Sequence, residues 1–128
     1  MMDITFPGGV AVNANFDGFT VPTDQPEGNG GQNAAPSPFK LFLASIGTCA
    51  GFYTVSFCQQ RNIDTTGLRL TLEPVRNSDT HRLDQIKILV HLPVGFPEKY
   101  KATLLRVIDQ CTVKKAMFDP PEFNVEMI

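Results

Sequence analysis

The stretch that decides the fold is residues 36–61, PSPFKLFLASIGTCAGFYTVSFCQQR, which holds no charged side chain between positions 41 and 58. That uncharged stretch is at the lower length limit of a membrane span. Serine, threonine and glycine dilute its apolar character, however, and its flanks lack the aromatic and basic anchors of a membrane helix. The composition therefore predicts a buried helix of a soluble protein, with no membrane partner.

The ends of this helix are marked by local signals. Ser37 suits the N-cap and Pro38 suits the first helical position. At the other end, Arg61 would sit favourably at the negative end of the helix dipole, and Asn62 can terminate the helix. We therefore expect one helix from about residue 38 to about residue 61.

Two of the three cysteines lie in this helix, nine residues apart. At 100° per residue, Cys49 and Cys58 point to opposite sides and cannot form a disulfide within the helix. Cys58 lies among large side chains and is expected to serve packing. Cys49 is surrounded by small residues such as Gly47 and Gly51, which leave room for a substrate or another backbone to approach.

The rest of the chain alternates between strand and helix patterns. Turn residues separate alternating apolar stretches, which predict strands, and helical spacing predicts a second helix that carries Cys111. We expect strands over 4–6, 10–16 and 19–21, a loop over 22–38, an antiparallel hairpin over 68–75 and 82–92, a helix over 97–117 and a final strand over 123–128. The fold class is α+β, in one domain spanning residues 1–128.

The first helix is apolar on almost every face, and a few short strands in a chain of this size cover one side of it. A second copy of the chain would supply the missing cover. We therefore expect a homodimer with a large apolar interface.

Composition excludes several classes of function. The formal net charge is −2 and no basic run occurs, so nucleic acid is not an expected partner. The N-terminal sequence lacks the pattern of a secretory signal, and three cysteines are too few for a disulfide scaffold, so a reducing, cytoplasmic location is expected. His81 and His91 have no metal-ligand spacing, and no metal or cofactor is expected.

Thiol chemistry is the remaining possibility. It needs a thiolate, a group that holds it ionised and a second thiol to capture the oxidised sulfur. Cys49 is the candidate nucleophile, and Cys111 the candidate second thiol. A helix break near Cys111 would place its thiol at a new helix N-terminus, where a thiol's pKa is lowered; the sequence leaves open whether the break occurs.

Two segments together resemble the OsmC superfamily, which includes osmotically inducible protein C and organic hydroperoxide resistance proteins. PSPFKLFLASIGTCAG, at 36–51, is similar to that family's first cysteine segment, and IDQCTVKKAM, at 108–117, to its second. The resemblance implies an intertwined homodimer in which antiparallel sheets wrap around two long central helices. It also implies a peroxidase in which Cys49 attacks an organic hydroperoxide, Cys111 captures the sulfenic acid as a disulfide, and a small dithiol or lipoyl-bearing protein reduces it again.

The chain departs from the peroxidase members at three places. Phe39 and Lys40 stand where those members carry a glutamate, and no arginine precedes Arg61, although the family arginine lies in the N-terminal strands. Thr112 replaces the proline that usually follows the second cysteine. The usual means of lowering the Cys49 pKa is therefore missing; a substitute cation could come from Arg69, Arg106 or Lys114, of the same chain or of a dimer partner, and the sequence does not choose among them.

Two hypotheses follow for function. The first is a thiol-dependent peroxidase that reduces organic hydroperoxides through Cys49 and Cys111. The alternative is a non-catalytic dimer of the same fold that binds a small apolar ligand in a pocket lined by Phe39, Phe42 and Phe52. A third interpretation is that the cysteines serve packing alone.

Overall fold

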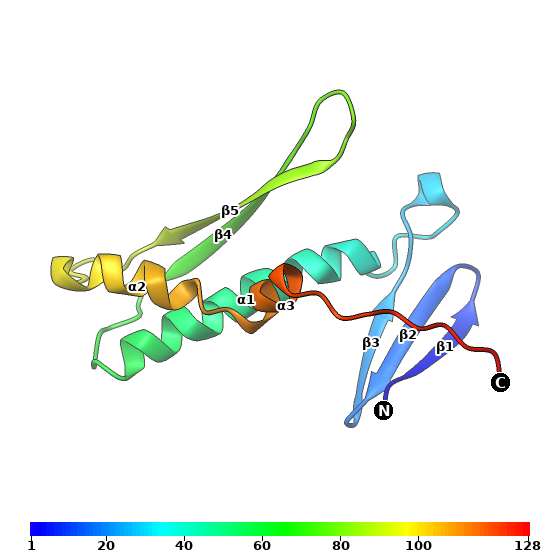
Figure 1. Ribbon diagram of the computed structural model, residues 1–128, viewed down its shortest axis with the longest axis horizontal. Helices are drawn as coiled ribbons and strands as arrows, with labels where there is room; N and C mark the ends of the chain where they lie inside the picture. The colour runs from blue at the N-terminus through cyan, green and yellow to red at the C-terminus, as the bar shows by residue number, and fades with distance from the viewer. The chain divides into compact units, whose positions relative to one another are not determined.

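The computed structural model describes residues 1–128, and its contacts divide the chain into two compact units, Met1–Ala44 and Ser45–Ile128. Helix α1 (Pro38–Gln59) begins in the first unit and continues into the second (Figure 1). Whether the whole chain acts as one domain, as the sequence predicts, stays a prediction.

The first unit is a three-stranded antiparallel sheet in the order β1-β2-β3, which confirms the predicted strands. Asp17 and Gly18 adopt φ angles of 49° and 81° and form the two-residue turn of the second hairpin. None of the sheet's hydrophobic side chains is buried; Phe6 is 79% exposed and Phe19 67%. The strands are β1 (Asp3–Gly8), β2 (Ala11–Phe16) and β3 (Phe19–Thr23).

The loop that follows β3 is folded around the carboxylate of Asp24. This buried group accepts hydrogen bonds from the backbone amides of Gln25, Gln32 and Ala34, at 2.8 to 3.1 Å. The amides, Ala34 first, lower the pKa of Asp24, so the loop's anchor is ionised at neutral pH. At Gly31 a Cβ atom would collide with the backbone of Gln25, which shows how tightly the loop closes. A short 3-10 helix, η1 (Glu27–Asn29), lies within it.

Helix α1 begins as its cap signals predict and ends slightly early. The amide of Lys40 donates to the Ser37 hydroxyl at 3.4 Å. The helix ends at Gln59, two residues before the predicted Arg61, and Asn62 adopts the left-handed conformation at φ 52°. The amide of Ile63 then donates to the carbonyl of Cys58, which closes the last turn.

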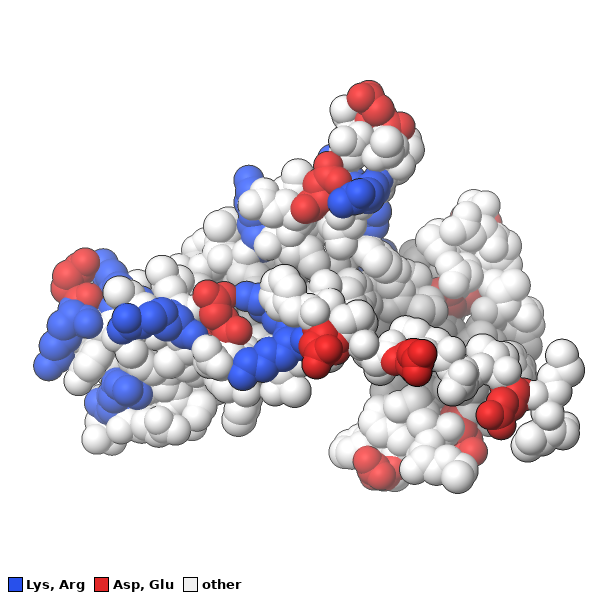
Figure 2. Space-filling model, viewed as in Figure 1, with Lys and Arg blue, Asp and Glu red and all other residues white.

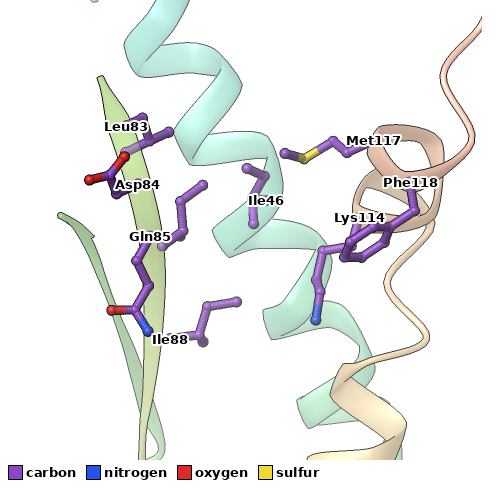
Figure 3. A pocket seen from close by; sticks show the side chains of 9 residues that line it. Ile46, Leu83, Asp84, Gln85, Ile88, Lys114, Met117 and Phe118 are labelled. Atoms are coloured by element: carbon purple, nitrogen blue, oxygen red, sulfur yellow. The ribbon is translucent and has the colours of Figure 1, made fainter. Parts of the chain in front are cut away.

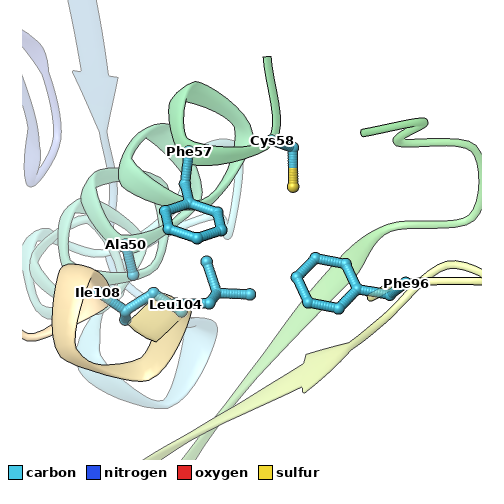
Figure 4. Packing of buried hydrophobic residues seen from close by; sticks show 6 residues of the cluster. All are labelled: Ala50, Phe57, Cys58, Phe96, Leu104 and Ile108. Carbon is cyan, nitrogen blue, oxygen red and sulfur yellow. The ribbon is translucent and has the colours of Figure 1, made fainter. Parts of the chain in front are cut away.

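The second unit packs a hairpin and short helices against one stripe of α1. Strands β4 (Arg69–Arg76) and β5 (Leu83–His91) pair in an antiparallel register, as predicted, with Leu70 opposite Val90 and Leu72 opposite Ile88. Figure 4 shows the core between these elements, which is formed by Ala50, Phe57, Cys58, Phe96, Leu104 and Ile108. The helices are η2 (Glu98–Tyr100), α2 (Lys101–Ile108) and α3 (Thr112–Phe118).

Only one stripe of α1 is buried in the single chain. By length and composition it is the one helix that could cross a membrane, but the core helix of a soluble protein passes the same test. The opposite face carries Phe52, which is 64% exposed. The expectation that the rest of the chain covers only one side of α1 is confirmed. The buried residues of α1 are Ile46, Ala50, Thr54, Phe57 and Cys58.

Two predicted elements differ from the structure. The predicted helix over 97–117 is divided, because residues 109–111 leave the helical path between α2 and α3. The predicted C-terminal strand over 123–128 is absent: the segment alternates Phe123, Val125 and Met127 but has no strand partner, and these side chains are exposed. Strand patterning alone cannot form a strand without an edge to pair with.

Two adjacent leucines of α2 test the packing of this core. Leu104 is 1% exposed and lies in the core, whereas Leu105 is 59% exposed. Replacing Leu104 by alanine should lower the free energy of unfolding by about 3 kcal/mol because it leaves a cavity. Leu105→Ala, the matched control, should change it by less than about 0.5 kcal/mol. Urea unfolding monitored by circular dichroism measures both, and equal losses would contradict this core.

Candidate functional site

Cys49 lies in the middle of α1, on a half-buried position beside two glycines. A Cβ atom added at Gly51 would meet no neighbour within 4 Å, so the helix surface is open there. At Gly47 it would make ordinary contact with Leu72 of β4, at 3.6 Å. Residues two apart on a helix point in nearly opposite directions, so neither glycine lies on the face that carries Cys49, and the Gly47 side faces the hairpin.

Cys111 lies in the break between α2 and α3. After α2 ends at Ile108, the chain turns through residues 109 and 110, and Cys111 takes the N-cap position of α3 with φ −47° and ψ 120°. Its side chain is fully buried. The sequence did not decide whether the helix breaks near Cys111. In the structure it does, and the break lies directly before Thr112, which stands where the family usually has proline.

The break brings the two thiols together, although they are far apart in sequence. The thiol of Cys111 is hydrogen-bonded to the sulfur of Cys49, and both cysteines are free rather than joined in a disulfide. Backbone amides of Val113 and Thr112 also donate to the sulfur of Cys49. Two thiols that interact are candidates for oxidation to a disulfide, which needs their Cβ atoms about 4 Å apart.

The surroundings drive the two thiols' acidities apart. Burial alone would raise the pKa of Cys49, but the hydrogen bonds from Cys111, Val113 and Thr112 outweigh it and hold this pKa below its ordinary value. Burial raises the pKa of Cys111, and its hydrogen bond to Cys49 raises it further. Cys49 is therefore the thiol that ionises first, and Cys111 stays protonated beside it.

None of the groups that lower the Cys49 pKa carries a charge. The three cations named as replacements for the family arginine are engaged elsewhere in the chain. Arg69 contacts His91 at 3.4 Å, Arg106 donates to Thr103 at 3.2 Å, and Lys114 pairs with Asp109 at 2.6 Å. Figure 2 shows that the lysine and arginine side chains on this face lie over the elements of the second unit; Lys40 is the single one before residue 45.

Sequence reasoning missed the amides at the start of α3 and the side chain of Tyr53. The Tyr53 hydroxyl lies 3.3 Å from the Thr112 hydroxyl, and the two share a hydrogen bond. Tyr53 follows Cys49 by four residues, so both lie on the same face of α1. That spacing was visible in the sequence, but the approach of Thr112 depends on the helix break and was not.

The remaining cysteine and the histidines lie apart from the thiol pair. Cys58 is fully buried in the core, where burial raises its pKa, which confirms the packing role. His91 bonds Thr71 at 2.9 Å across the hairpin, and His81 lies in the turn between β4 and β5. No group of three or more His, Cys, Asp or Glu side chains is arranged to hold a metal ion.

A pocket of about 440 Å³ opens in the second unit between α1, β5 and α3, and neither Cys49 nor Cys111 lines it. Figure 3 shows Ile46 of α1, one turn before Cys49, facing the side chains of β5 and of α3 across it. Its walls are mainly apolar, with Lys114, Asp84 and Gln85 adding polar groups. Phe39, Phe42 and Phe52, which the sequence suggested as pocket lining, do not line it. The lining is Ile46, Leu83, Asp84, Gln85, Ile86, Ile88, Lys114, Met117 and Phe118.

Solved structures show the same fold. A protein from Psychrobacter arcticus 273-4, assigned to the osmotic stress and detoxification response, matches with a TM-score of 0.75 and 21% identity over 90% of this chain and 85% of that one. An OsmC-like protein from Mycoplasma pneumoniae matches with a TM-score of 0.65 and 17% identity over 94% and 89%. An organic hydroperoxide resistance protein OsmC from Legionella pneumophila matches with a TM-score of 0.58 and 18% identity over 91% and 88%.

A search of curated protein sequences gave no significant match. The model of the family described as OsmC-like protein matches residues 30–126, which include both cysteine segments. With the fold in agreement, the chain belongs to the OsmC-like protein family.

Proposed function

We propose that this protein is a thiol-dependent peroxidase that reduces organic hydroperoxides, with Cys49 as nucleophile and Cys111 as resolving thiol. The observation that carries the proposal is the hydrogen bond between the two thiols. The roles follow from their surroundings: Cys49 is half-buried, and Cys111 is fully buried. The organic hydroperoxide resistance protein with this fold in Legionella pneumophila supports the same chemistry.

The reaction has two chemical steps on the protein. The Cys49 thiolate attacks one peroxide oxygen, the O–O bond breaks, and the alcohol leaves after taking up a proton, so that Cys49 becomes a sulfenic acid. The sulfur of Cys111 then attacks the Cys49 sulfur, and water leaves with the thiol proton as the disulfide forms. A dithiol or lipoyl-type reductant supplies two electrons and two protons and restores both thiols.

The acidities suit this order of events. A thiol with an ordinary pKa near 8.5 is only a few per cent thiolate at neutral pH. The lowered pKa of Cys49 increases that fraction, while the raised pKa of Cys111 preserves a protonated partner. Backbone amides and a thiol thus take over the task for which the peroxidase members use an arginine.

We also propose that the working form is a homodimer. Three apolar surfaces lack cover in the single chain: the face of α1 that carries Phe52, the sheet of the first unit with its exposed Phe6 and Phe19, and the alternating segment over 123–128. Exposed apolar surface of this extent is typical of an interface between chains. A second copy supplies complementary sheet edges and helix faces, because the same elements are unpaired in both copies.

The cavity favours one alternative function. The volume of this mainly apolar pocket, about 440 Å³, falls within the range of small-molecule sites. Such a pocket would suit a non-catalytic protein that binds an apolar ligand. Under this alternative the thiols do not turn over. The two functions differ in the reactivity of Cys49.

The first test is turnover. Wild-type protein with dithiothreitol or dihydrolipoamide should consume cumene hydroperoxide, and Cys49→Ser should abolish this because the nucleophile is lost. Cys111→Ser should still form the sulfenic acid in a single turnover, detected by dimedone labelling, but should not form the internal disulfide. Cys58→Ala is the control and should keep the activity, since its side chain only packs in the core. No consumption by wild-type protein with either reductant would refute the peroxidase.

The second test measures acidity directly. The rate of alkylation of Cys49 by iodoacetamide should rise with pH around a pKa below that of an ordinary thiol, because its hydrogen bonds favour the thiolate. Site-resolved mass spectrometry should show that Cys111 and Cys58 react more slowly at every pH, since both are buried and burial raises their pKa. A Cys49 pKa at or above the ordinary value would favour the ligand-binding alternative.

The third test concerns assembly. At micromolar concentration the protein should sediment at twice its chain mass of 14.1 kDa. Phe52→Glu should shift it toward the monomer by placing a charge in the apolar interface. Val94→Glu is the control, because Val94 lies fully exposed in a turn and should not affect assembly. A wild-type monomer at this concentration would rule out the homodimer.

A further inference from the structure

Two hydroxyl groups join the segments that carry the thiols. Tyr53 lies one turn after Cys49 on α1, and Thr112 follows Cys111 as the first residue of α3. Their oxygens are 3.3 Å apart. The hydrogen bond therefore links the helix that carries the nucleophile to the segment whose amides surround it, at a point adjacent to both cysteines.

We propose that Tyr53 and Thr112 are a positioning pair, which ties the start of α3 to α1 and keeps the backbone amides of Thr112 and Val113 directed at the sulfur of Cys49. This inference rests on the proposed role of Cys49 as nucleophile. Neither residue touches the reacting atoms through its side chain in this role. Each acts through the orientation of the peptide groups that follow Cys111.

The start of α3 needs such a tie. The helix has seven residues, and helices of this length are not stable by themselves in water. Its first turn has no side-chain cap, and its last turn is exposed. The position of its amides therefore depends on contacts with the rest of the protein, and the hydroxyl pair is a directional contact at its first residue.

Threonine at position 112 has two functions that other residues would separate. Its backbone amide donates to Cys49, and its hydroxyl bonds Tyr53. A proline there could begin the helix but has no N–H to donate. Valine would keep the amide and lose the hydroxyl. Of the charged groups nearby, Lys114 is paired with Asp109, so that its charge is balanced by a carboxylate.

The experiment measures the apparent pKa of Cys49 by alkylation in five test variants and one control variant of the full chain. Tyr53→Phe and Thr112→Val each remove the hydroxyl pair and should raise this pKa by about half a unit. The double variant should raise it no further, because the two hydroxyls form one bond. Thr112→Ser should keep the wild-type value, and Thr112→Pro should raise it more than valine because an amide donor is also lost.

Tyr100→Phe is the control for loss of a tyrosine hydroxyl, since the Tyr100 ring packs edge-on against Phe57 in the core, and it should leave the pKa unchanged. A wild-type pKa in Tyr53→Phe or Thr112→Val would overturn the proposal, as would a double variant whose shift equals the sum of the single shifts. The readout needs no peroxide. A protein without turnover but with this pattern of pKa values would refute the peroxidase and leave the positioning pair in place.

Discussion

The hydrogen bond between the thiols of Cys49 and Cys111 is the interaction on which the site depends. It requires α1 to present Cys49 on a half-buried face and the second helical segment to leave its path at residues 109–111. The core around Leu104 and Phe57 holds α2 against α1 just before that break. Packing of ordinary apolar residues thereby fixes the separation of two groups that are far apart along the chain.

The arrangement stabilises a thiolate without a full positive charge. The backbone amides are already fixed in place, so no further desolvation free energy is needed when the thiolate forms. A buried arginine, by contrast, needs a carboxylate to balance its charge. Under the proposed peroxidase function, these amides would replace the arginine of the peroxidase members, whose glutamate position is held here by Phe39 and Lys40. Arg69, Arg106 and Lys114 bond to other partners in the chain.

Local signals in the sequence were enough for much of the fold. The Ser37 and Pro38 cap, the Asp17–Gly18 turn and the alternation of the β4–β5 hairpin each depend on a few neighbouring residues, and each was predicted. The break before Thr112 was not decided, because threonine is compatible with a continuous helix.

The C-terminal strand was predicted wrongly, since Phe123 and Val125 alternate but find no partner edge in one chain. Of the site, the cysteines were named from sequence; the amides and Tyr53 depend on tertiary contact.

The most direct measurement of the central claim is the product of one equivalent of an organic hydroperoxide. Treated without reductant and digested under non-reducing conditions, the protein should yield a peptide pair in which Cys49 is linked to Cys111, with the mass of both peptides less two hydrogen atoms. Recovery of Cys49 and Cys111 as unmodified thiols, or a disulfide that involves Cys58, would contradict the account.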